Sequence, residues 1–155
     1  MQLIKDLFSV NEILTVSLLG WFVAQVLKTI IHLIVTKQFV LERMVGSGGM
    51  PSSHAATVCA LATAAGLEFG GGSFEFAVAV ILAIIVMHDA RGVRRETGIQ
   101  ARILNEMMEA FRKMGNKMTA EERLKEFVGH TPLQVLVGAV LGIIIGAGTW
   151  WLMNQ

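Results

Sequence analysis

The sequence Gly48-Gly49-Met50-Pro51-Ser52-Ser53-His54 stands between two apolar segments of the chain. Glycines let a backbone approach a ligand closely, and proline suits the first position of a helix. We therefore expect a helix to begin at Pro51, with two serine hydroxyls and an imidazole beside its unpaired N–H groups. A helix start of this kind favours an anion. The stretch predicts phosphate chemistry at the mouth of a membrane helix.

The composition indicates that lipid is the solvent for most of the chain. Of its 155 residues, 54% are hydrophobic and only 16% are charged, whereas soluble domains have about 25% charged residues. The length predicts a single membrane domain over residues 1–155. One cysteine, Cys59, excludes an intrachain disulfide framework.

Four apolar segments make up the predicted domain, at about residues 13–35, 55–67, 74–87 and 133–153. The first and last are long enough to cross a bilayer, which requires ~20 residues. The two middle segments are short for a full crossing, and the Gly70–Ser73 stretch predicts a turn between them. The expected fold is an all-α integral membrane bundle of about four hydrophobic helices.

A polar region, residues 88–130, separates the third and fourth segments. Within it Ile99, Ile103, Met107 and Phe111 recur every four residues, which predicts an amphipathic helix. This helix is expected to rest on the membrane or on the bundle and to end at Gly115-Asn116. A capped start at residues 119–122 predicts a second, short helix.

Basic residues lie mostly on one side of the predicted membrane. The 36–53 loop and the 88–130 region hold 11 of the 13 Lys and Arg residues, and the other two are Lys5 and Lys28. Because cytoplasmic loops carry the excess of positive charge, this side is expected to face the cytoplasm of a multi-pass protein of the cell membrane. The orientation assumes four full crossings.

All candidate catalytic groups fall on this cytoplasmic side. Besides the 51–54 stretch, they lie in His88-Asp89-Ala90-Arg91-Gly92-Val93-Arg94-Arg95 and in Gly129-His130-Thr131-Pro132. Phosphoryl transfer needs a nucleophile, a proton donor for the leaving oxygen, and cations for the phosphate oxygens. Arginine suits the last task because its planar guanidinium binds phosphate in a bidentate way.

The chain resembles the type-2 phosphatidic acid phosphatase superfamily, which also includes the vanadium haloperoxidases. Residues 49–54 and 129–138 resemble the second and third signatures of that superfamily. The segment Asp89–Arg95, with Gly98, Gln100-Ala101 and Asn105, resembles the divergent branch of small bacterial and plant membrane proteins. The resemblance extends from about Trp21 to Gly142.

The resemblance implies a role for each matching residue. His130 takes the place of the nucleophile that forms a phosphohistidine, and His54 takes the place of the histidine that protonates the leaving group. Ser52 and Ser53 take the place of hydrogen-bond donors to phosphate. The phosphatases of the superfamily are metal independent, so neither a metal nor another cofactor is expected.

This sequence also departs from the superfamily pattern. The aspartate that orients the nucleophilic imidazole is replaced by Gln134, and the arginine before that histidine is replaced by Leu124. Gln134 is still expected to orient the ring, because its amide oxygen can accept a hydrogen bond from an imidazole N–H and so fix the tautomer. The first signature has no clean counterpart, and its candidate substitutes are Lys28, or Lys37 with Arg43. The Asp89–Arg95 cluster is a candidate source of the missing cations, with Asp89 as an orienting group.

Several of these residues have a simpler interpretation. Arg91, Arg94 and Arg95 would also serve as a positive-inside anchor. Lys28 shares a helix face with Gln25 and His32, so either a structural hydrogen bond or a phosphate contact suits it. The stripe of Gly138, Gly142 and Gly146 predicts helix packing, either within the bundle or between the protomers of a homo-oligomer.

The sequence therefore predicts a membrane phosphatase that acts on a lipid phosphate or diphosphate at the cytoplasmic surface. One alternative is a catalytically impaired protein that binds a phospholipid or an isoprenyl phosphate. Another is a structural or transport subunit assembled through the glycine stripe. Nucleic acid is not an expected partner, because the basic residues lie beside membrane spans.

Overall fold

The computed structural model describes residues 11–37, 49–114, 124, 129–153 and 155, and it is helical with no strand within these ranges. The helices are α2 (Glu12–Thr36), α3 (Ser53–Phe69), α4 (Phe74–Arg91), α5 (Val93–Lys113) and α6 (Pro132–Met153). The chain is an all-α membrane bundle, as its apolar segments predict. Residues 115–123, which hold the expected end of the amphipathic helix and the start of the second short helix, lie outside the described residues, as does Arg43.

Three helical stretches are long and apolar enough to cross a membrane: α2, α6, and the stretch Phe74–Lys113 that contains α4 and α5. The third helix is longer than its apolar segment predicts, because α4 continues four residues beyond Met87 to Arg91. By contrast, α3 has only 17 residues. At 1.5 Å per residue it is about 25 Å long, which is less than the ~30 Å thickness of the hydrocarbon core.

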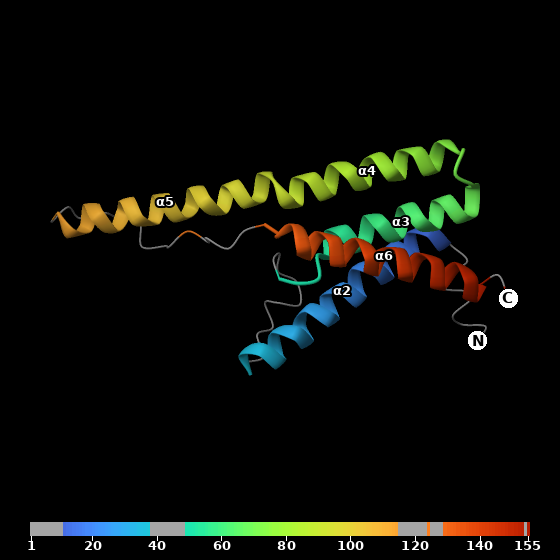
Figure 1. Ribbon diagram of the computed structural model, residues 1–155, viewed down its shortest axis with the longest axis horizontal. Helices are drawn as coiled ribbons and strands as arrows, with labels where there is room; N and C mark the ends of the chain where they lie inside the picture. Colours follow the sequence, from blue (N-terminus) through green and yellow to red (C-terminus); the bar gives the residue numbers. More distant parts are fainter. Residues whose placement is uncertain (1–10, 38–48, 115–123, 125–128, 154) are drawn as a thin grey trace.

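The short helix α3 is the centre of the bundle and packs against α2, α4 and α6 (Figure 1). Its buried side chains are mostly alanines, among them Ala55, Ala56, Ala60 and Ala64, which are at most 4% exposed. Small side chains let helices approach closely. The large apolar side chains of the surrounding helices are instead exposed, as expected for a surface that contacts lipid.

The glycine stripe of α6 packs on α3 of the same chain. A Cβ added at Gly138 or Gly142 would collide with the backbone carbonyl oxygen of Ser52 or Ala56, respectively. A Cβ added at Gly146 would lie 2.8 Å from the Cβ of Thr63. The stripe therefore provides packing within the bundle, which is one of the two predicted alternatives. A homo-oligomer through these glycines stays a prediction.

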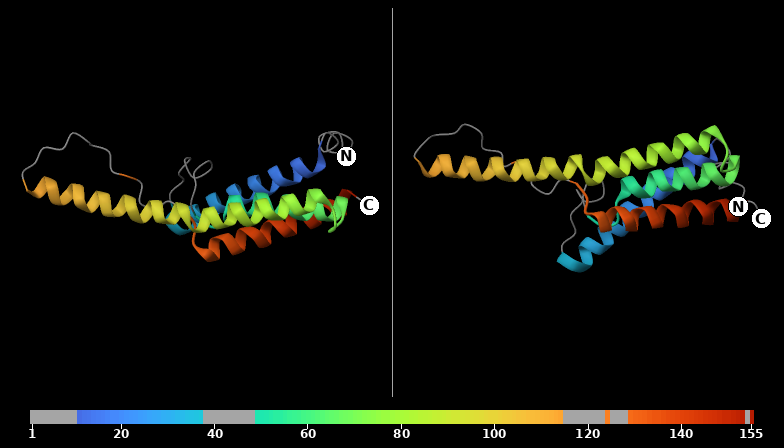
Figure 2. Two further views of the ribbon diagram at one scale, coloured as in Figure 1. Left: turned by 90° about the horizontal axis from the view of Figure 1, so that it is seen from above. Right: turned by 45° about the horizontal axis from the view of Figure 1, so that its top comes forward.

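The two ends of the bundle differ. The start of α2, the Gly70–Ser73 turn and the end of α6 lie at one end (Figure 2). At this end the hydroxyl of Ser73 caps α4 by accepting a hydrogen bond from the N–H of Phe76 at 3.2 Å. The starts of α3 and α6 and the end of α4 lie at the opposite end, which holds the candidate catalytic residues.

The predicted amphipathic helix is α5, and it continues α4 across Gly92 (Figure 1). Its apolar residues Ile99, Ile103, Met107 and Phe111 are between 44% and 52% exposed. The opposite face holds Asn105, whose side chain makes hydrogen bonds of 2.9 and 3.0 Å with the backbone of Leu124. Two locations were predicted for this helix, the membrane surface and the bundle. Since α5 extends beyond the other described helices, it does not lie on the bundle (Figure 1).

Candidate functional site

Two backbone hydrogen bonds bring the three candidate segments together at one end of the bundle. The N–H of Ser52 donates to the carbonyl oxygen of Gln134 at 3.0 Å, which ties the start of α3 to the start of α6. The N–H of His130 donates to the carbonyl oxygen of Ala90 at 3.0 Å, which ties the segment before α6 to the end of α4. Because these contacts involve only main-chain atoms, they position the segments independently of side-chain chemistry.

The helix that holds His54 begins later than predicted. Ser52 is the N-cap of α3, and its hydroxyl accepts a hydrogen bond from the N–H of Ala55 at 3.4 Å. Pro51 lies before the cap, so the prediction that it occupies the first helical position is wrong. A serine N-cap satisfies an N–H group that a proline cannot, which favours this start. Both Ser52 and Ser53 are buried.

His54 and His130 lie next to each other. Their ring centroids are 5.8 Å apart and the ring planes meet at 65°, in an edge-to-face arrangement. His54 is half-buried in the first turn of α3, while His130 is only 2% exposed. The Nε2 atom of His130 is buried and has no partner in hydrogen-bond geometry among the described residues. A buried nitrogen of this kind is costly unless a ligand or water supplies its partner.

Gln134 bonds to the backbone that holds His130 and lies beside the imidazole. Its Oε1 accepts a hydrogen bond from the N–H of Thr131 at 3.1 Å, while the Thr131 hydroxyl accepts one from the N–H of Gln134 at 3.3 Å. This is a capping box, a Thr-x-x-Gln pattern at a helix start. The stretch Thr131-Pro132-Leu133-Gln134 carries this pattern, although the capping box was not predicted from it. Pro132 is the first residue of α6, as expected.

The same Oε1 atom lies 3.3 Å from Nδ1 of His130. An amide oxygen only accepts hydrogen bonds, so this contact requires the proton on Nδ1 and leaves the lone pair on Nε2. The predicted role of Gln134 in fixing the tautomer is consistent with this distance.

The environment of His130 favours its neutral form. Burial lowers the pKa of the imidazole most, and the nearby positive charges of His54 and Lys28 lower it further, while the hydrogen bond to Gln134 and a backbone contact with Gly49 oppose them. A neutral imidazole is the form in which Nε2 has a free electron pair.

Lys28 reaches the site from the middle of α2. It is 2% exposed, and its Nζ donates a hydrogen bond to Oε1 of Gln25 at 2.6 Å. Gly49 packs on its aliphatic stem, since a Cβ there would lie 3.2 Å from Cγ of Lys28. Gly49 also has a φ of 88°, which a residue with a side chain rarely adopts. The predicted structural hydrogen bond of Lys28 is therefore present. The ammonium group that makes this bond also lies close enough to His130 to lower its pKa.

The arginine cluster lies at the junction of α4 and α5. Arg91 is the last residue of α4 and is exposed, Asp89 is half-buried, and Gly92 separates the two helices. Arg94 and Arg95 belong to the first turn of α5, but their side chains lie outside the described residues. Their contact with phosphate stays a prediction. Lys37, at the end of α2, is exposed.

Comparison with known proteins gives one family. The model of the "Divergent PAP2 family" matches residues 9–145. The chain is 39% identical over 138 residues to YuiD of Bacillus subtilis (strain 168), described as an uncharacterized membrane protein, and the match covers 83% of this chain and 87% of that protein. No solved structure matches the chain.

Proposed function

Since the chain belongs to the divergent PAP2 family, we propose that it is a membrane phosphatase that acts on a lipid phosphate or diphosphate through a phosphohistidine intermediate. The observation that carries the proposal is the pair of histidines with ring centroids 5.8 Å apart, one of which has a buried and unsatisfied Nε2. A phosphate that enters beside this pair meets a nucleophile and a proton donor at once.

In the first step, Nε2 of His130 attacks phosphorus and forms an N–P bond while the bond from phosphorus to the leaving oxygen breaks. His54 gives its proton to that oxygen, so a neutral alcohol, or a phosphate in the case of a diphosphate, departs. In the second step, His54 takes a proton from water, and the resulting hydroxide displaces the phosphate from His130. Because Nε2 is buried, both steps require the site to open to the substrate.

The remaining groups of the site stabilise negative charge. In the proposal, the start of α3 contributes the positive end of its helix dipole, and the hydroxyls of Ser52 and Ser53 donate hydrogen bonds to the phosphate. Lys28 supplies a buried positive charge near the histidines, where a low dielectric strengthens its attraction for phosphate. In the proposal, Arg91, Arg94 and Arg95 hold the outer phosphate oxygens, and Asp89 orients them.

A second candidate function is binding without turnover, and Gln134 is the observation that favours it. A carboxylate next to the nucleophilic histidine would stabilise the imidazolium that forms in the reaction, whereas a neutral amide does not. Gln134 Oε1 also bonds to the N–H of Thr131. A protein of this kind would keep the phosphate pocket and bind a phospholipid or isoprenyl phosphate. The third alternative, a subunit assembled through the glycine stripe, has less support because that stripe is buried against α3.

The proposed location is the cell membrane, with the site on the cytoplasmic side. The charge asymmetry supports this orientation, because 11 of the 13 Lys and Arg residues lie in the 36–53 and 88–130 segments of the sequence, next to His54 and His130. An impermeant thiol reagent added to intact cells is expected to label Gly71→Cys, in a Cys59→Ala background, from outside. Protection of Gly71→Cys together with outside labelling of Lys37→Cys would place the site on the outer face.

Phosphate release tests the enzymatic proposal. The protein is purified in detergent and assayed with a panel of long-chain alkyl phosphates, phosphatidic acid and prenyl diphosphates. We expect release by the wild-type protein and none by His130→Ala of equal monodispersity. If the wild-type protein binds a lipid phosphate tightly but releases no phosphate from any of the panel, the binding function is the correct one.

A further inference from the structure

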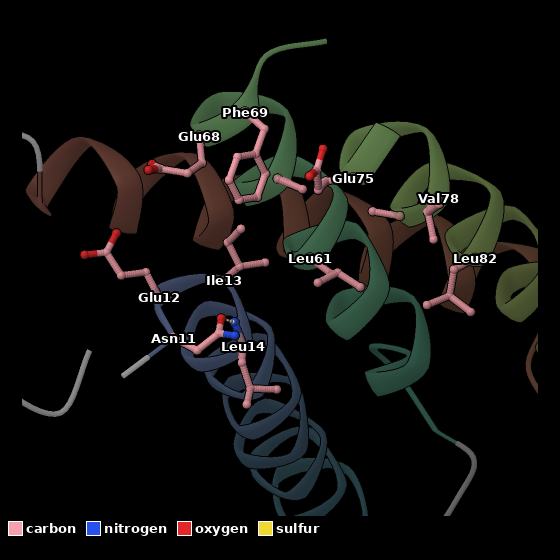
Figure 3. Close-up of a pocket in the computed structure, with 12 residues that line it drawn as sticks. Asn11, Glu12, Ile13, Leu14, Leu61, Glu68, Phe69, Glu75, Val78 and Leu82 are labelled. Atoms are coloured by element: carbon pink, nitrogen blue, oxygen red, sulfur yellow. Dashed lines mark hydrogen bonds between the residues drawn. The ribbon is translucent and has the colours of Figure 1, made fainter. Parts of the chain in front are cut away.

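A cavity of ≈ 630 Å³ opens between α2, α3 and α4, near the end of the bundle away from the histidines (Figure 3). Its walls are mostly apolar and include Leu14, Leu61 and Leu82, one from each helix. Its rim holds three carboxylates, those of Glu12, Glu68 and Glu75. This volume lies within the roughly 300–1,000 Å³ that small-molecule sites occupy. The mechanism proposed above does not use it.

The cavity and the candidate site lie on the same face of α3. Residues seven apart are nearly two turns apart and therefore share one face of a helix. On α3 this spacing joins His54, Leu61 and Glu68, so the face that carries His54 continues into the cavity and ends at its rim.

The flanking helices repeat this relationship. On α4 the spacing of seven joins Glu75 and Leu82, which line the cavity, to Asp89 at the site. On α2 it joins Leu14 to Lys28 through Trp21. The helices α2 and α4 lie on either side of α3 and diverge toward the site (Figure 1). These spacings predict an apolar path over α3, from the cavity and its acidic rim toward the histidines, which we call the groove.

The groove is open to the membrane. Leu14 is 55% exposed, Trp21 40% and Leu82 42%, although all three are large apolar side chains. In a bilayer the molecules available to cover them are hydrocarbon chains. The charges at the two ends of the groove also differ, because Lys28 and the histidines lie at one end and the three glutamates at the other. An amphiphile with an anionic head therefore fits in one direction only.

We propose that this groove holds a single long hydrocarbon tail of the amphiphile whose phosphate occupies the site. The proposal rests on the proposed function for the position of the phosphate. From His54 to Glu68 the groove is about 21 Å long, at 1.5 Å per residue. This exceeds half of the ~30 Å hydrocarbon core. A tail that fills the groove therefore extends beyond the midplane of the bilayer, and chain length is a determinant of affinity.

Photocrosslinking tests the position of the tail without requiring turnover. Hexadecyl phosphate with a diazirine near the middle of its tail is added to the wild-type protein in detergent, and the labelled residues are mapped. We expect labelling of the cavity walls, around Leu61 and Leu82, that excess hexadecyl phosphate abolishes and octyl phosphate does not. Labelling spread over the outer faces of α2, α4 and α6, without competition, would overturn the proposal.

A matched pair of variants tests the groove by affinity. Leu82→Trp places extra volume in the cavity, whereas Ile81→Trp adds the same side chain at the neighbouring position of α4, which is 57% exposed and outside the cavity lining. Leu82→Trp is expected to weaken the binding of hexadecyl phosphate by about tenfold and Ile81→Trp by less than about twofold. If the two variants bind hexadecyl phosphate with equal affinity, the proposal that the groove holds the tail is overturned.

The two proposals fail in different ways. Competed labelling at Leu61 and Leu82 without phosphate release would keep the tail site and reject the phosphatase. Phosphate release that is equally fast for octyl and hexadecyl phosphate, with no labelling in the groove, would keep the phosphatase and reject the tail site.

Discussion

The side-chain oxygen of Gln134 lies 3.3 Å from Nδ1 of His130, one turn into the helix that His130 precedes. The same oxygen closes the capping box with Thr131. One amide thus holds the start of α6 and the tautomer of the imidazole beside it. In this arrangement Nε2 of His130 is the nitrogen that can attack phosphorus. Gln134, which holds the proton on Nδ1, carries no charge. The rate of the proposed reaction depends on that neutrality.

The first prediction concerns the charge at position 134. Gln134→Glu keeps the capping box, because glutamate also suits the third position of this motif, and it places a carboxylate next to the imidazole. We expect the pKa of His130 to rise and phosphate release to accelerate by roughly tenfold, since a carboxylate stabilises the imidazolium that forms on attack. The measurements are phosphate-release kinetics and the pH titration of His130 by NMR.

The control for this variant is Thr131→Ala, which removes the hydroxyl of the capping box and leaves the contact between Gln134 and His130. It is expected to lower stability by about 1 kcal/mol without changing the pKa of His130. An unchanged His130 titration in Gln134→Glu would show that this side chain does not contact the imidazole.

The second prediction concerns the packing of α6 on α3. Gly142→Val forces a side chain against the backbone of α3, where a Cβ would already collide with the carbonyl of Ala56. Overpacking of this kind destabilises a core by about 1–3 kcal/mol. Gly148→Val on the same helix is the control, because a Cβ at that position meets nothing within 4 Å. Thermal unfolding in detergent should show a lower Tm for Gly142→Val alone, and equal Tm values would contradict the packing.

The third prediction follows from the lowered pKa of His130. The unfolded imidazole titrates near 6.5, whereas burial lowers the pKa in the folded protein. Between these two values the unfolded chain binds more protons, so stability increases with pH. The contribution of His130 is fully present above about pH 6.5 and is lost as the pH falls through the folded pKa. His130→Gln should flatten the dependence of Tm on pH in this window, and an unchanged dependence would contradict the lowered pKa.

The fourth prediction concerns the buried ammonium of Lys28. Lys28→Met keeps the length of the side chain and removes its charge. A charge-assisted contact contributes roughly 1.5–3 kcal/mol, so the affinity for vanadate or inorganic phosphate should fall by about tenfold or more. Gln25→Met removes one hydrogen-bond partner of Lys28 and keeps the charge, so its affinity should change less. Equal affinities for Lys28→Met and the wild-type protein would assign Lys28 a purely structural role.

Hydrophobicity predicted the helices well, because the bilayer thickness fixes how long an apolar segment must be. The first and last apolar segments agree with α2 and α6 within one residue at each end. The start of α3 was predicted incorrectly because Pro51 and Ser52 are both residues that begin helices, and only the capping geometry distinguishes them. The central position of α3 was not predicted, since it depends on which helices its small residues contact.

The candidate site was predicted in part. Three segments far apart in the sequence supply the residues of the site. The structure brings together His54, His130, Gln134 and Lys28. The resemblance indicated which residues share a site, whereas the distances depend on the main-chain contacts of Ser52 and His130. The groove over α3 was not predicted, because it depends on the angles at which α2 and α4 leave α3. Residue spacing alone does not determine those angles.

The most direct test of the phosphatase is the covalent intermediate. The protein is mixed with a lipid phosphate labelled with radioactive phosphorus, denatured in alkali within the first turnover, and separated from lipid. We expect label on the wild-type protein that is stable in alkali and released by acid, as for a phosphohistidine, and no label on His130→Ala. Phosphate release by the wild-type protein without such label, or equal labelling of His130→Ala, would contradict the assignment of His130 as the nucleophile.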